Sequence, residues 1–96
     1  MTEESPSDAT AFLELGKLYN QAGKYSGAVQ ALREAITLNP SLAEAHYTLG
    51  FLQKELGERR AAIESFEKFL ALEPSSAEAA AIRDEVFFLK RGSSQN

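Results

Sequence analysis

Residues 43–76 read AEAHYTLGFLQKELGERRAAIESFEKFLALEPSS, and this stretch decides the fold because it repeats what precedes it. Residues 9–42, ATAFLELGKLYNQAGKYSGAVQALREAITLNPSL, align with it without a gap. A repeat of fixed period indicates that each unit is one supersecondary element, which buries its apolar face by stacking on its copy. The matched positions are Leu15-Gly16 with Leu49-Gly50, Gly23 with Gly57, Ala28 with Ala62, and Pro40-Ser41 with Pro74-Ser75.

Length and composition restrict the class of protein. The chain has 96 residues, which is one domain by length, and it contains no Cys, which excludes disulfides and thiolate metal sites. Its formal net charge is −4, so it lacks the basic surface that nonspecific binding to nucleic acid or to an anionic membrane requires. Its polar start, MTEESPSD, is unlike a signal peptide, and no apolar run approaches the roughly 20 residues that span a bilayer. We therefore expect a cytoplasmic protein that binds neither nucleic acid nor membranes.

Apolar residues recur at helical spacing in both repeats and in the segment that follows them. Gly23 and Gly57 predict the end of the first helix of each repeat, because glycine readily adopts the left-handed conformation. Pro40 and Pro74 end the second helix, because a proline disfavours helix in the residue before it. The chain is thus expected to be all-α with five helices. Repeat one (about residues 9–42) and repeat two (about 43–76) contribute one helix pair each, and a last helix follows at about 76–90.

The ends of the chain are expected to be flexible polar tails, at residues 1–6 and 92–96, on either side of a single domain at 7–91. Helix starts are predicted from capping residues. Ser7 or Asp8 is expected to cap the first helix. The S-x-x-E pattern of a capping box begins at Ser41 and again at Ser75, which predicts the starts of the third and fifth helices.

Two glycines, Gly16 and Gly50, lie inside predicted helices rather than at their ends. Each costs about 1 kcal/mol relative to Ala, and that cost is explained if a partner helix comes close at this point. We expect the small residues Ala28 and Ala62 to face them across each helical hairpin.

The matched positions resemble the tetratricopeptide repeat, whose signature is W-x2-L-G-x2-Y…A-x3-F…P over about 34 residues. The resemblance covers residues 9–76 and implies two full repeats followed by a capping helix. It further implies a right-handed superhelix of antiparallel helix pairs, A and B, in which the A helices line a concave groove that binds a peptide or a helix of a partner. Repeat one carries Phe12, Leu15, Gly16, Tyr19, Ala28, Leu32 and Pro40, and repeat two carries His46, Leu49, Gly50, Gln53, Ala62, Phe66 and Pro74.

Several positions depart from this signature. His46 and Gln53 are more polar than the aromatic residues of the pattern, and Phe69 stands where Ala is usual. After the second repeat, Arg83 and Asp84 stand where the pattern has Leu-Gly. The last helix is therefore expected to be a cap rather than the start of another repeat.

No group of residues with catalytic chemistry is found in the sequence. His46 is the only histidine, so neither a metal site nor a Ser-His-Asp relay has the partners it needs. No glycine-rich phosphate loop is present either. We expect His46 to be a partly buried packing residue, the alternative being a ligand or a base. The chain is expected to have no catalytic activity, no cofactor and no metal.

The resemblance places a partner-binding groove on the A helices. Its expected residues are Leu13, Lys17, Asn20, Tyr47, Thr48, Phe51, Lys54 and Phe88. Chaperone-binding members of the family hold a peptide carboxylate with Lys, Arg and Asn on the A helices. Here those positions are occupied by Leu13, Lys17, Thr48, Glu78 and Ile82. Since only Lys17 is cationic, an acidic chaperone tail is not expected as the partner.

Tyr47 and Phe51 are four residues apart and share one helix face. Exposed aromatic residues on a concave surface favour binding of a partner protein. We interpret this face as a noncatalytic groove for an apolar or amphipathic peptide or helix. The alternative is that the two rings pack against the next A helix.

A second hypothesis is a small self-assembling scaffold protein. Residues 86–89 read VFFL, and a helix cannot turn four consecutive residues toward one neighbour, because they are about 100° apart. Phe88 is the residue of this run that cannot be turned toward the neighbouring helix. It would be buried either in a homodimer formed by two copies of the last helix or over the chain's own groove, near Tyr47 or Phe51.

Overall fold

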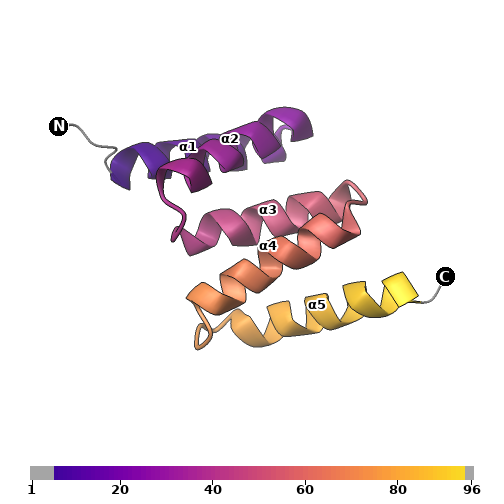
Figure 1. Cartoon of the computed structure of the whole chain (residues 1–96). Coiled ribbons are helices and arrows are strands. Elements are labelled where there is room, and N and C mark those ends of the chain that lie inside the picture. Colours follow the sequence, from indigo (N-terminus) through magenta and orange to yellow (C-terminus); the bar gives the residue numbers. More distant parts are fainter. Residues whose placement is uncertain (1–5, 95–96) are drawn as a thin grey trace.

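The computed structural model describes residues 6–94, and within that range every regular element is a helix (Figure 1). The all-α fold with five helices is confirmed. The helices are α1 (Pro6–Gln21), α2 (Tyr25–Leu38), α3 (Ala43–Glu55), α4 (Arg59–Leu72) and α5 (Ala79–Ser94).

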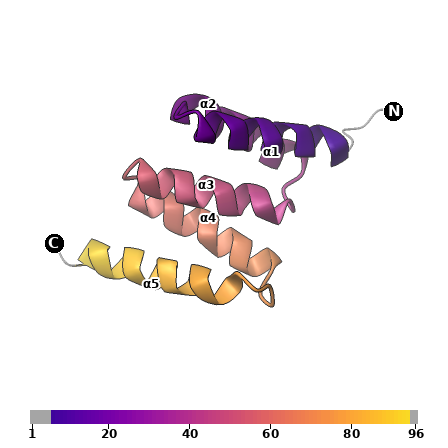
Figure 2. The ribbon, with the colours of Figure 1, turned by 180° about the vertical axis from the view of Figure 1, so that it is seen from behind.

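The helices form a stack of three layers. Figure 1 shows the hairpins α1–α2 and α3–α4 one over the other with α5 as the last layer, and the reverse view in Figure 2 shows the same order. The stack measures 49 × 30 × 20 Å. Helix α3 is central, because it packs against both α2 and α4. We call the side of the stack built by α1, α3 and α5 the A face, and the side built by α2 and α4 the B face.

The turn inside each hairpin depends on a glycine, as the sequence predicts. Gly23 and Gly57 have φ angles of 78° and 80°, which L side chains rarely adopt. The next residue then closes the turn. The N–H of Lys24 donates to the carbonyl of Tyr19 at 2.8 Å, and the N–H of Glu58 donates to that of Gln53 at 2.8 Å. These bonds satisfy carbonyls that the end of a helix would leave unpaired.

The predicted starts of α1 and α3 are wrong. Helix α1 already includes Pro6, so Ser7 and Asp8 lie inside its first turn. Helix α3 follows Leu42 and has no side-chain cap, because the N–H of Ser41 instead donates to Asn39 Oδ1 at 3.1 Å and forms a local turn.

The cap helix is displaced along the sequence relative to the prediction. Two backbone bonds, from the N–H of Ser76 to the carbonyl of Glu73 and from the N–H of Ala79 to that of Ser76, keep residues 73–78 in turns, so α5 begins only at Ala79. At its other end it continues to Ser94, so part of the predicted tail at 92–96 is helical. The predicted tail at residues 1–6 lies outside the described residues, except for Pro6.

Both internal glycines allow close approach between the helices of a hairpin, as expected. A Cβ placed on Gly16 would lie 2.8 Å from Leu32 Cγ and 3.4 Å from the carbonyl oxygen of Ala28. A Cβ on Gly50 would lie 2.6 Å from Phe66 Cδ1. The nearest neighbour of Gly50 is therefore a ring, not the predicted Ala62, because the larger side chain four residues further on reaches across the hairpin.

Two buried clusters hold the layers together. The first joins α1 and α2 to α3 and includes Leu13, Leu32 and Leu52. The second joins α4 to α5 around Phe66 and Ile82, with partly buried side chains of α3 packed against it. Because side chains of α3 pack in both clusters, the position of α3 is fixed by the first hairpin on one side and by α4 and α5 on the other.

Candidate partner-binding surface

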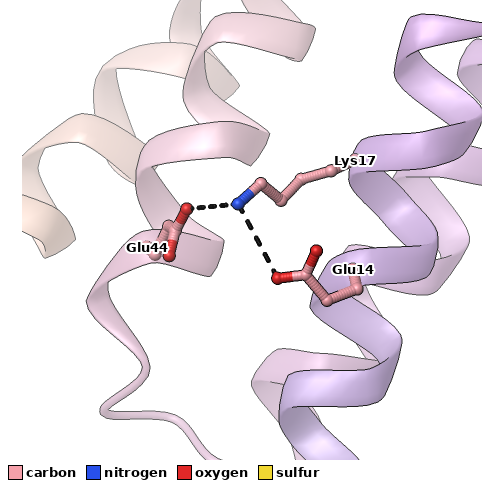
Figure 3. A network of polar contacts seen from close by, with 3 residues as sticks. All are labelled: Glu14, Lys17 and Glu44. Atoms are coloured by element: carbon pink, nitrogen blue, oxygen red, sulfur yellow. Dashed lines mark hydrogen bonds and ion pairs between the residues drawn. The ribbon is translucent and has the colours of Figure 1, made fainter.

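Two ion pairs cross the A face between successive layers. Lys17 Nζ of α1 donates to Glu44 Oε2 of α3 at 2.6 Å and also lies 3.8 Å from Glu14 Oε2 (Figure 3). Lys54 Nζ of α3 lies 3.0 Å from Glu85 Oε1 of α5. The predicted groove cations are therefore bound to carboxylates of the chain itself.

The electrostatics of Lys17 follow from this arrangement. The hydrogen bond to Glu44 raises the pKa of Lys17 above its ordinary value of 10.5, partial burial opposes the rise, and the charges of Glu44 and Glu14 add to it. A lysine held between two carboxylates offers little charge to a third. The A face therefore lacks a cation for a partner's carboxylate at this point.

The two aromatic side chains predicted for the groove are half-buried rather than fully exposed. The Tyr47 ring makes edge contacts with Phe51 and Phe69, at centroid distances of 5.1 and 5.2 Å. Phe51 lies against the buried ring of Phe66, at 4.9 Å. The rings of Tyr47 and Phe51 are thus partly buried against α4, the second helix of their own hairpin, whereas the alternative interpretation placed them against the next A helix.

A cavity of about 410 Å³ opens beside Tyr47. It lies where the start of α3, the end of α4 and the turn before α5 meet. We call it the α3–α5 cavity, and its lining consists of two aromatic rings, three carboxylates and two small side chains. These residues are Ala43, Glu44, Tyr47, Phe69, Glu73, Ser76 and Glu78.

The polar groups of the α3–α5 cavity are not all used inside the protein. Glu44 binds Lys17, but within residues 6–94 neither Glu73 nor Glu78 forms an ion pair. The buried Oγ of Ser76 has no hydrogen-bond partner in the described structure. A buried hydroxyl without a partner is costly, and this oxygen is sealed from solvent although other atoms of Ser76 line the cavity. The cavity therefore combines an aromatic base with unpaired acceptors.

Not every predicted groove residue reaches this surface. Leu13 is only 3% exposed and belongs to the first buried cluster, so its assignment to an open groove is wrong. The cause is that Leu13 enters the cluster in which α1 packs against side chains of α2 and α3, such as Leu32 and Leu49. Asn20 and Thr48 are half-buried. Lys54 is engaged with Glu85, and its ammonium lies 5.7 Å from the centre of the Phe51 ring.

Phe88 lies apart from Tyr47 and Phe51. It is 65% exposed, and its ring contacts Phe87, with centroids 5.7 Å apart. It does not fold over the chain's own groove, so that alternative is wrong for the single chain. The face of α5 that would meet a further helix carries the exposed Arg83 and Asp84, which suits a terminal helix.

Sequence reasoning missed Phe69, Glu73 and Ser76. They come from the end of α4 and the turn after it, which the family pattern does not assign to the groove. The one signal in the sequence was the bulky Phe69 at a position where the pattern has Ala. Its ring closes the base of the cavity beside Tyr47.

Comparison with known families agrees with this geometry. Residues 16–57 match a family model described as TPR repeat, and residues 43–76 match one described as Tetratricopeptide repeat. The chain belongs to the tetratricopeptide-repeat family. The family is generally a noncatalytic interaction fold, and among the described residues no group of His, Cys, Asp and Glu is placed to hold a metal ion. No described helix is both long and apolar enough to cross a bilayer.

Solved structures include close matches to the fold of this tetratricopeptide-repeat chain. "Crystal structure of MamA" matches with a TM-score of 0.81 and 29% identity, over 94% of this chain and 51% of that one. A second MamA structure gives 0.72 and 29%, over 91% and 53%. The chain thus spans about half the length of the MamA chains. No curated protein sequence matches it.

A third structure shares the fold at lower identity. It is "First TPR of Spaghetti (RPAP3) bound to HSP90 peptide SRMEEVD", with a TM-score of 0.56 and 19% identity, over 98% of this chain and 100% of that one. At this identity the likeness concerns the fold alone.

Proposed function

We propose that the chain is a noncatalytic module that binds an amphipathic segment of a partner protein on its A face, at the α3–α5 cavity. The observation that carries the proposal is the half-buried Tyr47, whose remaining surface lines a cavity together with the carboxylates of Glu73 and Glu78, which form no ion pair within the described residues. An apolar side chain of the partner would cover the exposed part of the Tyr47 ring, which rests on the buried Phe69. Aromatic anchors of this kind contribute strongly to binding when a partner desolvates them.

The charge of the cavity defines the polar part of the partner. Glu73 and Glu78 form no ion pair within the described residues, whereas both lysines of this face are engaged. A Lys or Arg of the partner segment would therefore find carboxylates, and a partner carboxylate would meet like charge. This sets the chain apart from the RPAP3 structure, whose bound peptide SRMEEVD is acidic. The proposed setting is the cytoplasm, since the chain is acidic and has no Cys.

The experiment is a selection of displayed random peptides on the immobilised chain, followed by fluorescence anisotropy with the enriched peptides. We expect peptides that combine apolar residues with Lys or Arg. The double variant Glu73→Gln/Glu78→Gln should weaken their binding at least about tenfold. Absence of Lys- or Arg-containing peptides from the enriched set, or binding of these peptides that the double variant leaves unchanged, would refute the proposal.

A matched control removes the same charge elsewhere. Glu34 and Glu58 are exposed, and Glu58 makes no side-chain bond to the start of α4. The variant Glu34→Gln/Glu58→Gln has the same net charge as the test variant. Its binding should equal that of the wild type, because the effect is local and not a consequence of net charge.

The exposed rings of α5 favour a second candidate function, a homodimeric scaffold. Phe87 and Phe88 are 55% and 65% exposed and lie in edge contact. Two copies of α5 related by a two-fold axis would bury both rings in one self-complementary patch. The two functions are separable, because the α3–α5 cavity lies at the start of α5 and the rings lie toward its end.

A further inference from the structure

A second and larger cavity lies on the B face. It measures about 760 Å³ and lies between α2 and α4, with α3 behind it. The Cα atoms of α2 and α4 stay more than 8 Å apart throughout residues 6–94, so only side chains could fill this space. We call it the B cavity. Its lining includes Arg33 of α2, His46 and Gln53 of α3, and Glu64, Ser65, Glu67 and Lys68 of α4.

The base of the B cavity is polar although it is buried. His46, Gln53 and Ser65 are 5%, 3% and 8% exposed. Ser65 donates its hydroxyl to Gln53 Oε1 at 2.7 Å, and His46 Nε2 donates to the carbonyl of Pro40 at 3.0 Å. The side-chain N–H groups of Gln53 have no acceptor within the described residues, yet they are not fully sealed from solvent. The base therefore presents unused hydrogen-bond donors to the cavity.

Comparison of the two repeats explains why the cavity exists. In repeat one the positions of His46, Gln53 and Ser65 are held by Phe12, Tyr19 and Ala31. The Tyr19 ring fills its space so closely that a Cβ on Gly27 would lie 3.2 Å from it. In repeat two, smaller polar side chains replace both aromatic rings and leave the space open.

The polar residues at these positions are expected to lower the stability of the fold relative to the aromatic residues of repeat one. Buried polar groups cost free energy unless every donor and acceptor is satisfied, and aromatic rings at these positions would bury more apolar area. These three buried polar side chains all line the same cavity. A ligand that accepts hydrogen bonds would satisfy the unused donors at the base of the cavity.

The rim identifies the charge of that ligand. Arg33 of α2 and Lys68 of α4 contribute cations from opposite sides, and Glu64 contributes one carboxylate. Glu67 is paired with Lys90 at 3.0 Å. The lining itself has two cations and two carboxylates, and because Lys90 from outside the lining neutralises Glu67, one positive charge is in excess at the rim.

We propose that the B cavity is a second binding site, which takes an acidic segment of a partner protein by a carboxylate that accepts hydrogen bonds from Gln53, Arg33 and Lys68. Bonds from a cation or an amide to a carboxylate are stronger than neutral ones. This site differs from the proposed function in face and in charge. The module would then hold a basic amphipathic segment on the A face and an acidic segment on the B face.

The probe is a fluorescein-labelled, capped peptide of alternating Glu and Ala, with the same peptide carrying Gln in place of Glu as the reference. We expect the Glu peptide to bind the full chain at least about tenfold more tightly at physiological salt. In ¹⁵N-labelled protein it should shift the side-chain amide signals of Gln53. Equal binding of the two peptides, or unmoved Gln53 signals at saturation, would overturn the proposal.

Two sets of variants separate binding from folding. The triple variant His46→Phe, Gln53→Tyr, Ser65→Ala introduces the residues of repeat one, and it should raise the melting temperature while it abolishes binding of the Glu peptide.

The exposed pair Arg33→Gln/Lys68→Gln keeps the packing and should weaken binding about tenfold. The variant Lys24→Gln/Arg60→Gln, with the same net charge, and Glu73→Gln/Glu78→Gln on the A face should not weaken it. A triple variant that folds and still binds the Glu peptide would place the peptide elsewhere.

Discussion

Gly50 of α3 lies directly under the ring of Phe66 of α4, so closely that a Cβ on Gly50 would come within 2.6 Å of both Cδ1 and Cε1. Phe66 is fully buried and cannot move without disturbing the second cluster. This contact sets the distance between the two helices of the hairpin, and it explains a glycine in the middle of a helix.

Gly50→Leu should therefore destabilise the protein strongly. Overpacking of a filled core costs about 1–3 kcal/mol, and a side chain at Gly50 has no open direction toward α4. Urea denaturation followed by circular dichroism measures the change. An unchanged midpoint would show that the hairpin can open at no cost and that the close-approach argument fails.

Gly92→Ala is the matched control, because Gly92 is also a helical glycine. A Cβ there would meet only the flexible side chain of Arg59, at 3.6 Å, which is ordinary contact. Removing a helical glycine gains up to about 1 kcal/mol from helix propensity, less near a helix end. Gly92→Ala should thus be neutral or stabilising under the same measurement.

The ion pair of Lys17 predicts a pH dependence. Because folding raises the pKa of Lys17, its contribution to stability is fully present below the ordinary value of 10.5 and is lost as pH rises through the higher folded value. Lys17→Met should cost about 0.2–1 kcal/mol at neutral pH, as for exposed pairs. The difference from wild type in urea denaturation should shrink above pH 10.5. A difference that grew with pH would contradict the sign.

Two serines should respond in opposite ways to replacement by alanine. Ser76→Ala removes a buried hydroxyl without a partner, so it should stabilise the free protein by about 1 kcal/mol or more. Ser65→Ala leaves Gln53 Oε1 without its donor and should destabilise by about 1–3 kcal/mol. Chemical denaturation of both variants tests the pair. Destabilisation by Ser76→Ala would mean that its hydroxyl does have a partner.

The two aromatic residues of α3 should differ in function. Tyr47→Ala should weaken binding of the selected basic peptides about tenfold, since the exposed part of its ring lines the α3–α5 cavity. Phe51→Ala should mainly lower stability, by roughly 1 kcal/mol or more, because its ring packs on buried Phe66. Anisotropy and denaturation on each single variant separate the effects. Undiminished binding in folded Tyr47→Ala would place the partner elsewhere.

Phe88→Asp tests the homodimer. Light scattering of the wild type at micromolar concentration should give about twice the chain mass of 10.5 kDa, and the variant should give the single mass. Leu18→Asp is the control, because Leu18 is equally exposed, at 61%, but lies on α1 at the other end of the stack. A wild-type mass of 10.5 kDa would eliminate the dimer, and a dimer that survives Phe88→Asp would not use these rings.

Local rules were enough to predict the number of helices, the hairpin glycines and the family. Positive φ at Gly23 and Gly57 follows from one residue type and one turn geometry. The capping boxes failed because Asn39 and the turn at residues 73–78 offered the backbone other hydrogen bonds. Local signals of similar strength compete at helix starts, and packing decides between them.

What the sequence by itself determined is therefore the repeat, the two helix pairs and the close approach at Gly16 and Gly50, because these depend on spacing within about 34 residues. Only the tertiary structure decided which side chains remain available to a partner. The packing of α1, α2 and α3 around one cluster buried Leu13, and the ion pairs between layers occupied Lys17 and Lys54. Both cavities are likewise formed by several elements that meet, and the distance between those elements depends on the packing of whole helices rather than on any one segment.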